Sequence, residues 1–235
     1  MYYYDMRVLD IFIALGAVRL NDHFVYVSGR HGAAYVNKDA IYPDTKATSA
    51  LCLRLATVFA KADVEVVVAP AIGGTILSQW VASYLSSWSA SGKNVLAVYA
   101  EKSSDGGFVL RRGYDALVAG KRALIVEDVL TTGGSVKKVV DAVRAASGTV
   151  VGVGALVNRG GVTAQALDVP RLHTLLDMSF ETWDVEECPL CAVGVPVNVE
   201  CGHGAAFLAA HPAYPRVAQI QVTPDVVSEE KSREQ

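Results

Sequence analysis

The sequence has no excess of basic residues and no long apolar run. It contains 21 lysines and arginines against 24 aspartates and glutamates, a formal net charge of −3. Proteins that bind nucleic acid through its phosphates need a basic surface, so this balance argues against a nucleic-acid partner. No stretch approaches the roughly 20 apolar residues that span a bilayer, and the N-terminus lacks a signal-peptide pattern. We therefore expect a cytoplasmic protein with no membrane partner.

Cysteine is also scarce. Four cysteines in 235 residues are too few for a disulfide scaffold. The ligand types of a Cys₃His zinc site occur at Cys188, Cys191, Cys201 and His203. A reversible disulfide and simple packing are the alternatives for these residues. The other histidines have no comparable sequence partners, and we interpret them as structural or surface residues: His23, His31, His173 and His211.

Short apolar runs that are followed by glycine-containing turns and helical patterns predict an α/β fold. The runs at 64–69, 95–99, 122–126 and 150–157 read as strands. Their continuous apolar character suits a parallel sheet that is covered on both faces. We predict a twisted parallel sheet flanked by helices, including one after residue 74 and one that ends near residue 146.

Two regions depart from this alternation of strands, turns and helices. Residues 18–42 alternate and are rich in Tyr, Gly and Asn, which predicts a strand pair that caps the sheet as a hood. Residues 101–121 contain adjacent glycines and predict a mobile hairpin, the flap. We expect one domain over 1–227, with its core at about 43–165. The hood would comprise about 1–42 together with 171–227, and 228–235 would form a polar tail.

The strongest chemical signal follows the strand at 122–126. The strand delivers Glu127 and Asp128 to its carboxyl end, and a Thr/Gly/Ser loop at 131–135 then opens a helix. Such a loop offers backbone N–H groups and hydroxyls to a phosphate. Adjacent acids would repel a phosphate, but they suit a ligand that also carries ribose hydroxyls. An ordinary strand–turn–helix with an acidic turn is the alternative.

This stretch resembles the phosphoribosyl-pyrophosphate motif of type I phosphoribosyltransferases. The resemblance implies that this donor binds at Glu127, Asp128, Val129, Leu130, Thr131, Thr132, Gly133, Gly134 and Ser135. A second glycine turn precedes it by some fifty residues, where the family holds the pyrophosphate through backbone amides. Its residues here are Ala71, Ile72, Gly73 and Gly74.

Two further features are similar to orotate phosphoribosyltransferases within that family. Arg159 follows the strand at 150–157, where a guanidinium can grip a carboxylate through two hydrogen bonds. Residues 23–38 resemble the family's hood pattern Phe…Ser-Gly-Arg…Asn. The resemblance implies that orotate is bound by Thr131, Arg159, Tyr35 and Val36. A surface arginine at a strand end and a capping hairpin are the structural alternatives.

The chain also departs from the family. Many orotate enzymes carry lysines where Val27 and Gly73 stand, and their flap is richer in basic residues. Here the flap supplies Lys102, Arg111 and Arg112, which with Asp128 are the candidate catalytic residues. The resemblance implies Mg²⁺ bound mainly through the substrate, and a homodimer whose subunits share the flap. The expected reaction makes orotidine monophosphate for pyrimidine synthesis. A phosphoribosyltransferase for another base and a non-catalytic regulator that binds the donor are the alternatives.

Overall fold

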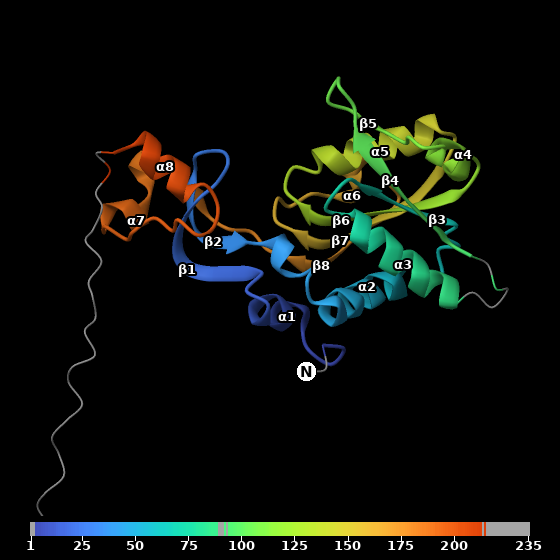
Figure 1. Ribbon diagram of the computed structural model, residues 1–235, viewed down its shortest axis with the longest axis horizontal. Helices are drawn as coiled ribbons and strands as arrows, with labels where there is room; N and C mark the ends of the chain where they lie inside the picture. Colours follow the sequence, from blue (N-terminus) through green and yellow to red (C-terminus); the bar gives the residue numbers. More distant parts are fainter. Residues whose placement is uncertain (1–2, 89–91, 93, 213, 215–235) are drawn as a thin grey trace, which may run out of the picture.

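The computed structural model describes residues 3–88, 92, 94–212 and 214, so the predicted tail at 228–235 lies outside the described residues. Its central sheet has the strand order β5-β4-β3-β6-β7-β8 (Figure 1). The strands are β3 (Val66–Pro70), β4 (Leu96–Lys102), β5 (Phe108–Val109), β6 (Arg122–Leu130), β7 (Thr149–Asn158) and β8 (Leu172–Asp177). All neighbouring pairs are parallel except β4 and β5, which form the predicted flap hairpin. The predicted α/β fold is confirmed.

Helices cover both faces of this sheet (Figure 1). On one face lie α2 (Thr45–Phe59) and α3 (Thr75–Ser87). On the other lie α4 (Tyr114–Val118), α5 (Gly134–Ala145) and α6 (Ala164–Leu167). The apolar stripe of α5 follows helical spacing and buries Val136, Val139, Val140 and Val143. Each face of the sheet thus has its own apolar cluster, and β3 between them is buried at every position.

A smaller sheet lies to the left of the core in Figure 1. It consists of β1 (Val18–Val25), β2 (His31–Val36) and β9 (Thr182–Trp183), paired antiparallel in that order. The short helices η2 (Val185–Glu187), α7 (Pro189–Ala192) and α8 (Gly204–Ala210) pack beside it. The predicted strand pair is therefore present, joined by a third strand from the C-terminal region.

One boundary of the predicted hood needs correction. Residues 171–227 were expected to belong to it as a whole, but β8 pairs in parallel with β7 and extends the core sheet. The segment 172–177 is half-buried at the sheet edge, so its sequence carries a weaker apolar signal than the interior strands. From here on, the hood means residues 18–36 and 182–212. The segment between hood and core contains α1 (Val8–Ala14) before β1, and η1 (Lys38–Ala40) after β2.

The order of the strands fixes where a ligand can bind. After β3 the chain passes through α3 to β4 on one side, whereas β6 lies on the other side of β3. A crevice forms at such a topological switch point, beyond the carboxyl ends of the strands. The predicted loops at 71–74 and 131–135 both begin there. Within the described residues, no helix is long and apolar enough to cross a membrane.

Candidate functional site

A cavity of about 420 Å³ opens at the carboxyl ends of β3 and β6, between the core and the hood. Its volume lies within the range of small-molecule sites. The predicted site residues that line it are Tyr35, Val36, Ala71, Ile72, Gly73, Lys102, Glu127, Asp128, Val129, Thr131, Ser135 and Arg159. The structure therefore brings residues from the hood, both glycine loops, the flap and the end of β7 to one place.

Asp128 is the most connected acid of the cavity. Its carboxylate is almost fully buried, and its Oδ2 accepts a hydrogen bond from Lys38 Nζ at 2.8 Å. The Tyr42 hydroxyl lies 3.1 Å from the same oxygen and 2.6 Å from Gly73 O. Burial lowers the pKa of Lys38, but the hydrogen bond and charge of Asp128 outweigh it and raise that pKa above its ordinary value. Asp128 thus joins the end of β6 to η1 and to the 71–74 loop.

The carboxyl group of Glu127 is buried, which disfavours its charged form. Its Oε1 accepts a hydrogen bond from the backbone N of Asp128 at 3.0 Å. Burial, with the charge of Asp128 beside it, raises the pKa of Glu127 to about 8. At neutral pH this carboxyl group is therefore largely protonated and can donate as well as accept a hydrogen bond. A ligand rich in hydroxyls suits such a pair of acids.

Gly73 packs directly against the Lys38–Asp128 pair. A Cβ at this position would lie 2.1 Å from Asp128 Oδ2 and 2.7 Å from Lys38 Nζ. Only glycine lets the loop approach the carboxylate this closely. The ammonium group of Lys38 stands beside the point where a side chain from position 73 would begin. Lys38 of η1 thus brings a positive charge next to this loop.

The Thr/Gly/Ser loop forms a second, smaller hollow of about 120 Å³. Three residues of the loop line this hollow and not the main cavity: Thr132, Gly133 and Gly134. The other residues that line it are Glu127, Val129, Leu130, Thr131, Ser135 and Val136. Gly133 has a φ of 74°, a conformation that glycine adopts at little cost. The 12-residue helix α5 begins at Gly134, so its N-terminal amides and dipole favour an anion here.

Arg159 reaches the cavity from the end of β7. Its backbone N donates to Leu130 O at 2.8 Å, and its guanidinium carbon lies 5.4 Å from the centre of the Tyr26 ring. The side chain of Asn158 holds the following turn through two hydrogen bonds of 3.0 Å with the backbone of Val162. Among the described residues, the Arg159 guanidinium forms no ion pair with a carboxylate. Its donors are therefore available to an acidic ligand.

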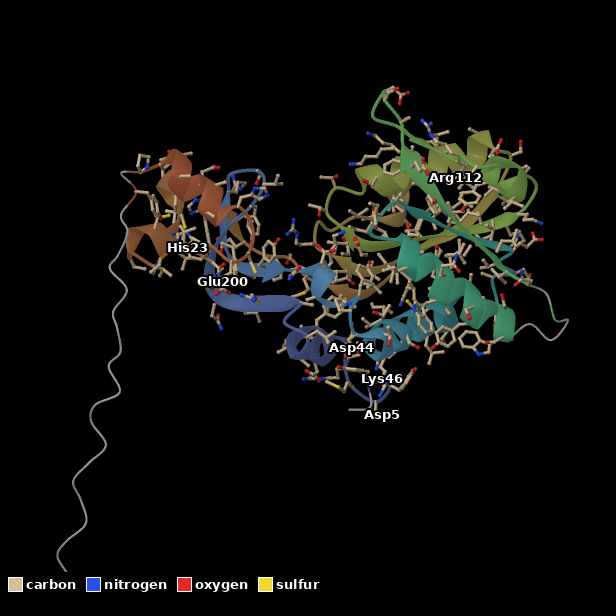
Figure 2. The ribbon with its side chains drawn as sticks, in the orientation of Figure 1. Asp5, His23, Asp44, Lys46, Arg112 and Glu200 are labelled. Atoms are coloured by element: carbon tan, nitrogen blue, oxygen red, sulfur yellow. The ribbon has the colours of Figure 1, made fainter. Side chains whose placement is uncertain are left out.

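The flap brings only part of its charge to the cavity. Lys102 lines the cavity, whereas Arg111 and Arg112 do not. The Nε atom of Arg112 lies 2.9 Å from Glu101 Oε1, and that of Arg111 lies 3.8 Å from Glu101 Oε2. Lys138 of α5 donates to Gly106 O at 2.6 Å and holds the flap tip against the core. Figure 2 shows Arg112 on the core beside β4, on the side away from the hood.

Cys188 and Cys191 do come together, but not with the partners that the sequence suggested. Their sulfurs cluster with His23 and His31, whereas Cys201 and His203 are not part of the cluster. Instead, the backbone N of Cys201 donates to Asn198 Oδ1, and His203 lines the main cavity. His23 and His31 had been interpreted as residues without partners. They pair because β1 and β2 lie side by side, which local sequence does not reveal.

The main cavity has further lining residues that sequence reasoning did not assign a role. They are Tyr26, Val27, Asn37, Lys38, Asp39, Pro70 and Phe108; His203, which was predicted as a zinc ligand, lines the cavity as well. Most of them lie within the predicted hood and flap. Their position in these two regions could therefore have identified them as candidates for lining the cavity. Tyr42, which contacts Asp128, also lies at the edge of the predicted hood but does not line the cavity.

Comparisons with known proteins agree with this geometry. Residues 46–186 match the phosphoribosyl transferase domain family. An orotate phosphoribosyltransferase of Desulforamulus reducens is 39% identical over 190 residues, which cover 81% of this chain and 93% of that protein. The orotate phosphoribosyltransferase of Thermus thermophilus is 38% identical over 193 residues, 82% of this chain and 99% of that protein.

A solved structure shares the fold. The orotate phosphoribosyltransferase of Mycobacterium tuberculosis, in complex with inorganic phosphate, aligns with a TM-score of 0.57 and 23% identity. The alignment covers 73% of this chain and 95% of that one. This likeness shows the fold, and the family model and the sequence relatives establish the family. The chain belongs to the orotate phosphoribosyltransferases within the phosphoribosyl transferase family.

Proposed function

We propose that this chain transfers ribose 5-phosphate from phosphoribosyl pyrophosphate to orotate, giving orotidine 5'-monophosphate and pyrophosphate. One observation carries the proposal: the guanidinium of Arg159 and the carboxylate of Asp128 face the same cavity, which the phosphate-cradling loop adjoins. A carboxylate-bearing base suits the arginine, and a ribose that carries phosphates suits the acids and the cradle. The relatives named orotate phosphoribosyltransferase support the same reaction.

The reaction breaks the bond between the anomeric carbon and the diphosphate and forms a bond from that carbon to a ring nitrogen of orotate. Positive charge develops on the ribose, as in glycoside chemistry, and no covalent nucleophile is required. We assign the ribose hydroxyls to Glu127 and Asp128, and the 5-phosphate to the loop from Thr131 to Ser135. Arg159 with the hood residues Tyr35 and Val36 would hold the base in line with the anomeric carbon.

The leaving diphosphate needs positive charge around it. Lys38 and Lys102 both line the cavity and can supply that charge, while backbone amides of the 71–74 loop can bind its oxygens. The donor and the acids of the cavity are rich in oxygen, which suits Mg²⁺ held mainly through the donor itself. When bound, Mg²⁺ neutralises part of the diphosphate charge. The flap would exclude water that could hydrolyse the activated ribose.

The test is the loss of orotate absorbance when purified protein is mixed with phosphoribosyl pyrophosphate and Mg²⁺. Loss that depends on all components supports the proposal. If orotate is untouched but another base is consumed, the chain is a phosphoribosyltransferase for that base. Stabilisation by the donor without release of pyrophosphate from any base would instead indicate a non-catalytic regulator.

We also propose a homodimer in which the flap of one subunit serves the site of the other. Family resemblance supports this arrangement, in which Lys102 of the partner's flap would take the place beside the diphosphate that the single chain gives to its own Lys102. Mixing Lys102→Ala with Asp128→Asn subunits, at a donor concentration at which neither variant alone is active, tests it. Exchange would restore about a quarter of wild-type activity if the sites are shared, because half the dimers would hold one intact site. No recovery after proven exchange would contradict sharing.

The compartment is a separate proposal. All four cysteines are free thiols, which suits a reducing compartment such as the cytoplasm. Fractionation of cells that express the chain at its natural level would test this, and recovery outside the cytoplasmic fraction would contradict it.

A further inference from the structure

The hood contains a cluster of four metal-binding side chains that the proposed reaction does not use. His23 comes from the end of β1, His31 from the start of β2, and Cys188 and Cys191 from α7 and the residue before it. One ligand atom of each residue lies within 4.8 Å of those of the others. The histidines and Cys188 are buried, and Cys191 is half-buried. Figure 2 shows His23 inside the hood, beside α7 and α8.

The distances within the cluster fit a tetrahedral ion. Cys188 Sγ lies 3.6 Å and Cys191 Sγ 3.7 Å from His23 Nε2, and Cys191 Sγ lies 3.3 Å from His31 Nδ1. Ordinary zinc–nitrogen and zinc–sulfur bonds at tetrahedral angles place such N and S atoms about 3.5 Å apart. His23 Nε2 and His31 Nδ1 are 2.7 Å apart. A shared ion would widen that pair by about 0.6 Å.

The surroundings orient the ligands as a metal site requires. His23 Nδ1 lies 2.7 Å from Val195 O and donates to it, which leaves a lone pair on Nε2, the atom that faces the cluster. The Tyr214 hydroxyl donates to Cys191 Sγ at 2.8 Å, a contact that stabilises a thiolate. The Cys-x-x-Cys spacing turns both sulfurs to the same side of the short helix. Three of the four ligands are thus positioned by identifiable neighbours or by helical geometry.

The hood also lacks the core that would hold its C-terminal half in place. Its buried apolar cluster consists of Val25, Val197 and Phe207, with a few half-buried neighbours. The helices α7 and η2 have four and three residues, too short to be stable by themselves. Small units of this kind usually need a disulfide or a metal. The four side chains lie where such a link would tie α7 to both strands of the hairpin.

We propose that His23, His31, Cys188 and Cys191 bind one structural zinc ion. Four protein ligands close the coordination shell, which is the pattern of a structural site and leaves no position for substrate. On binding, both thiols release their protons to solvent, and His31 carries its remaining proton on Nε2. The ion joins β1, β2 and α7 into one unit.

This unit forms one wall of the main cavity. Gly32, next to His31, packs so closely on Tyr26 that a Cβ there would lie 2.3 Å from the tyrosine oxygen. The backbone N of His203 donates to Val25 O at 2.8 Å, and both Tyr26 and His203 line the cavity. The zinc ion therefore fixes the hood residues that face the ligand, without touching the ligand itself.

The experiment measures metal in the untagged, full-length chain after expression with added zinc and exhaustive dialysis. Elemental analysis should give about one zinc per chain. The Cys188→Ser/Cys191→Ser double variant should lose it, while the matched variant Cys201→Ser should retain it. Removal of zinc by a strong chelator should lower the Tm of the wild type by about 5 °C or more and leave that of the double variant unchanged.

A spectroscopic measurement on the wild type keeps the proposal testable if the double variant does not fold. Replacement of zinc by Co²⁺ should give the intense visible bands of tetrahedral cobalt and a thiolate charge-transfer band. Absence of zinc together with no saturable uptake of Zn²⁺ or Co²⁺ by the reduced protein would overturn the proposal. So would zinc that survives in the double variant but is lost from Cys201→Ser. A metal-free protein in which Cys188 and Cys191 are oxidised to a disulfide would also overturn it.

Discussion

Lys38 and Asp128 form an ion pair across the floor of the main cavity, with Nζ 2.8 Å from Oδ2. The pair connects η1, which follows the hood, to the carboxyl end of the central strand β6. The side chain of Asp128 is 6% exposed and that of Lys38 is 38% exposed, so solvent reaches the cation but hardly the acid. The contact therefore links the position of the hood to the acid that we assign to the ribose.

The first prediction concerns the energy of this pair. In a double-mutant cycle of Lys38→Met and Asp128→Asn, we expect a coupling free energy of about 1 kcal/mol. The value is modest because solvent around the partly exposed lysine screens the interaction. Urea unfolding of the four proteins measures it. The exposed pair Arg7–Asp10 is the control and should show no measurable coupling, because solvent screens it. Strict additivity at Lys38 and Asp128 would mean that the contact contributes nothing to stability.

The second prediction concerns the role of Asp128 in binding the donor. Asp128→Asn removes the charge but keeps the shape, so hydrogen bonds from ribose hydroxyls to the acid weaken. Loss of a charged hydrogen bond corresponds to about 1.5–3 kcal/mol, or roughly a 10- to 100-fold rise in KM for phosphoribosyl pyrophosphate. Initial-rate kinetics with the donor varied would measure this. Unchanged donor kinetics would remove Asp128 from the ribose site.

The third prediction concerns Arg159 and the choice of base. Arg159→Ala should raise the KM for orotate by about 10- to 100-fold and change that for the donor by less than about twofold. Arg159→Lys should restore little, because an ammonium group cannot form two parallel hydrogen bonds to a carboxylate.

Arg171 offers a matched control for this variant. Its guanidinium carbon lies 5.1 Å from the centre of the Phe59 ring, much as that of Arg159 lies over Tyr26, but it does not line the cavity. Arg171→Ala should leave both KM values near wild type. Equal effects of Arg159→Ala on both substrates would place this arginine outside the base site.

Sequence patterns predicted the parts of the molecule that depend on local order. The run from Arg122 to Ser135 contains a strand, two acids, a glycine turn and a helix start within one segment, so its geometry follows from neighbours along the chain. The strand β8 escaped prediction because it lies half-buried at the sheet edge and has no strong apolar pattern.

Contacts between distant segments were harder to predict. Lys38 and Asp128 are 90 positions apart, and His23 and Cys188 are 165 apart. Each contact depends on how the hood is placed against the rest of the molecule. In the hood, Val25 pairs with His31, and this register brings His31 within reach of His23. The sequence alone shows which residue types could form such a cluster, but not which of those residues come together.

The fourth prediction is a pH dependence of stability that arises from Glu127. Its pKa is about 8 in the folded protein against an ordinary value of 4.5, so between these values the folded state holds a proton that the unfolded state has lost. The free energy of unfolding therefore falls as pH rises through this window, by at most about 1.4 kcal/mol per pH unit.

Glu127→Gln isolates this contribution because glutamine does not ionise. We expect the Tm of the variant minus that of the wild type to increase steadily from pH 5 to pH 8. The exposed Glu186→Gln variant is the matched control. A flat difference for Glu127→Gln would mean that this carboxyl group ionises at its ordinary pKa despite its burial.

The last prediction separates the basic residues of the flap. Lys102 faces the cavity, whereas Arg112 is held by Glu101 at 2.9 Å. If charge beside the leaving diphosphate accelerates the reaction, Lys102→Ala should lower kcat by about 100-fold. Arg112→Ala should lower it by less than about fivefold, because this arginine contributes to flap structure and not to the diphosphate site. Single-turnover rates with saturating substrates would compare the two variants without the influence of product release. An equal loss in both would mean that Arg112 leaves Glu101 during turnover and reaches a reacting site, its own or that of a neighbouring subunit. In that case the flap moves further than its contacts with Glu101 and Lys138 allow in the present conformation.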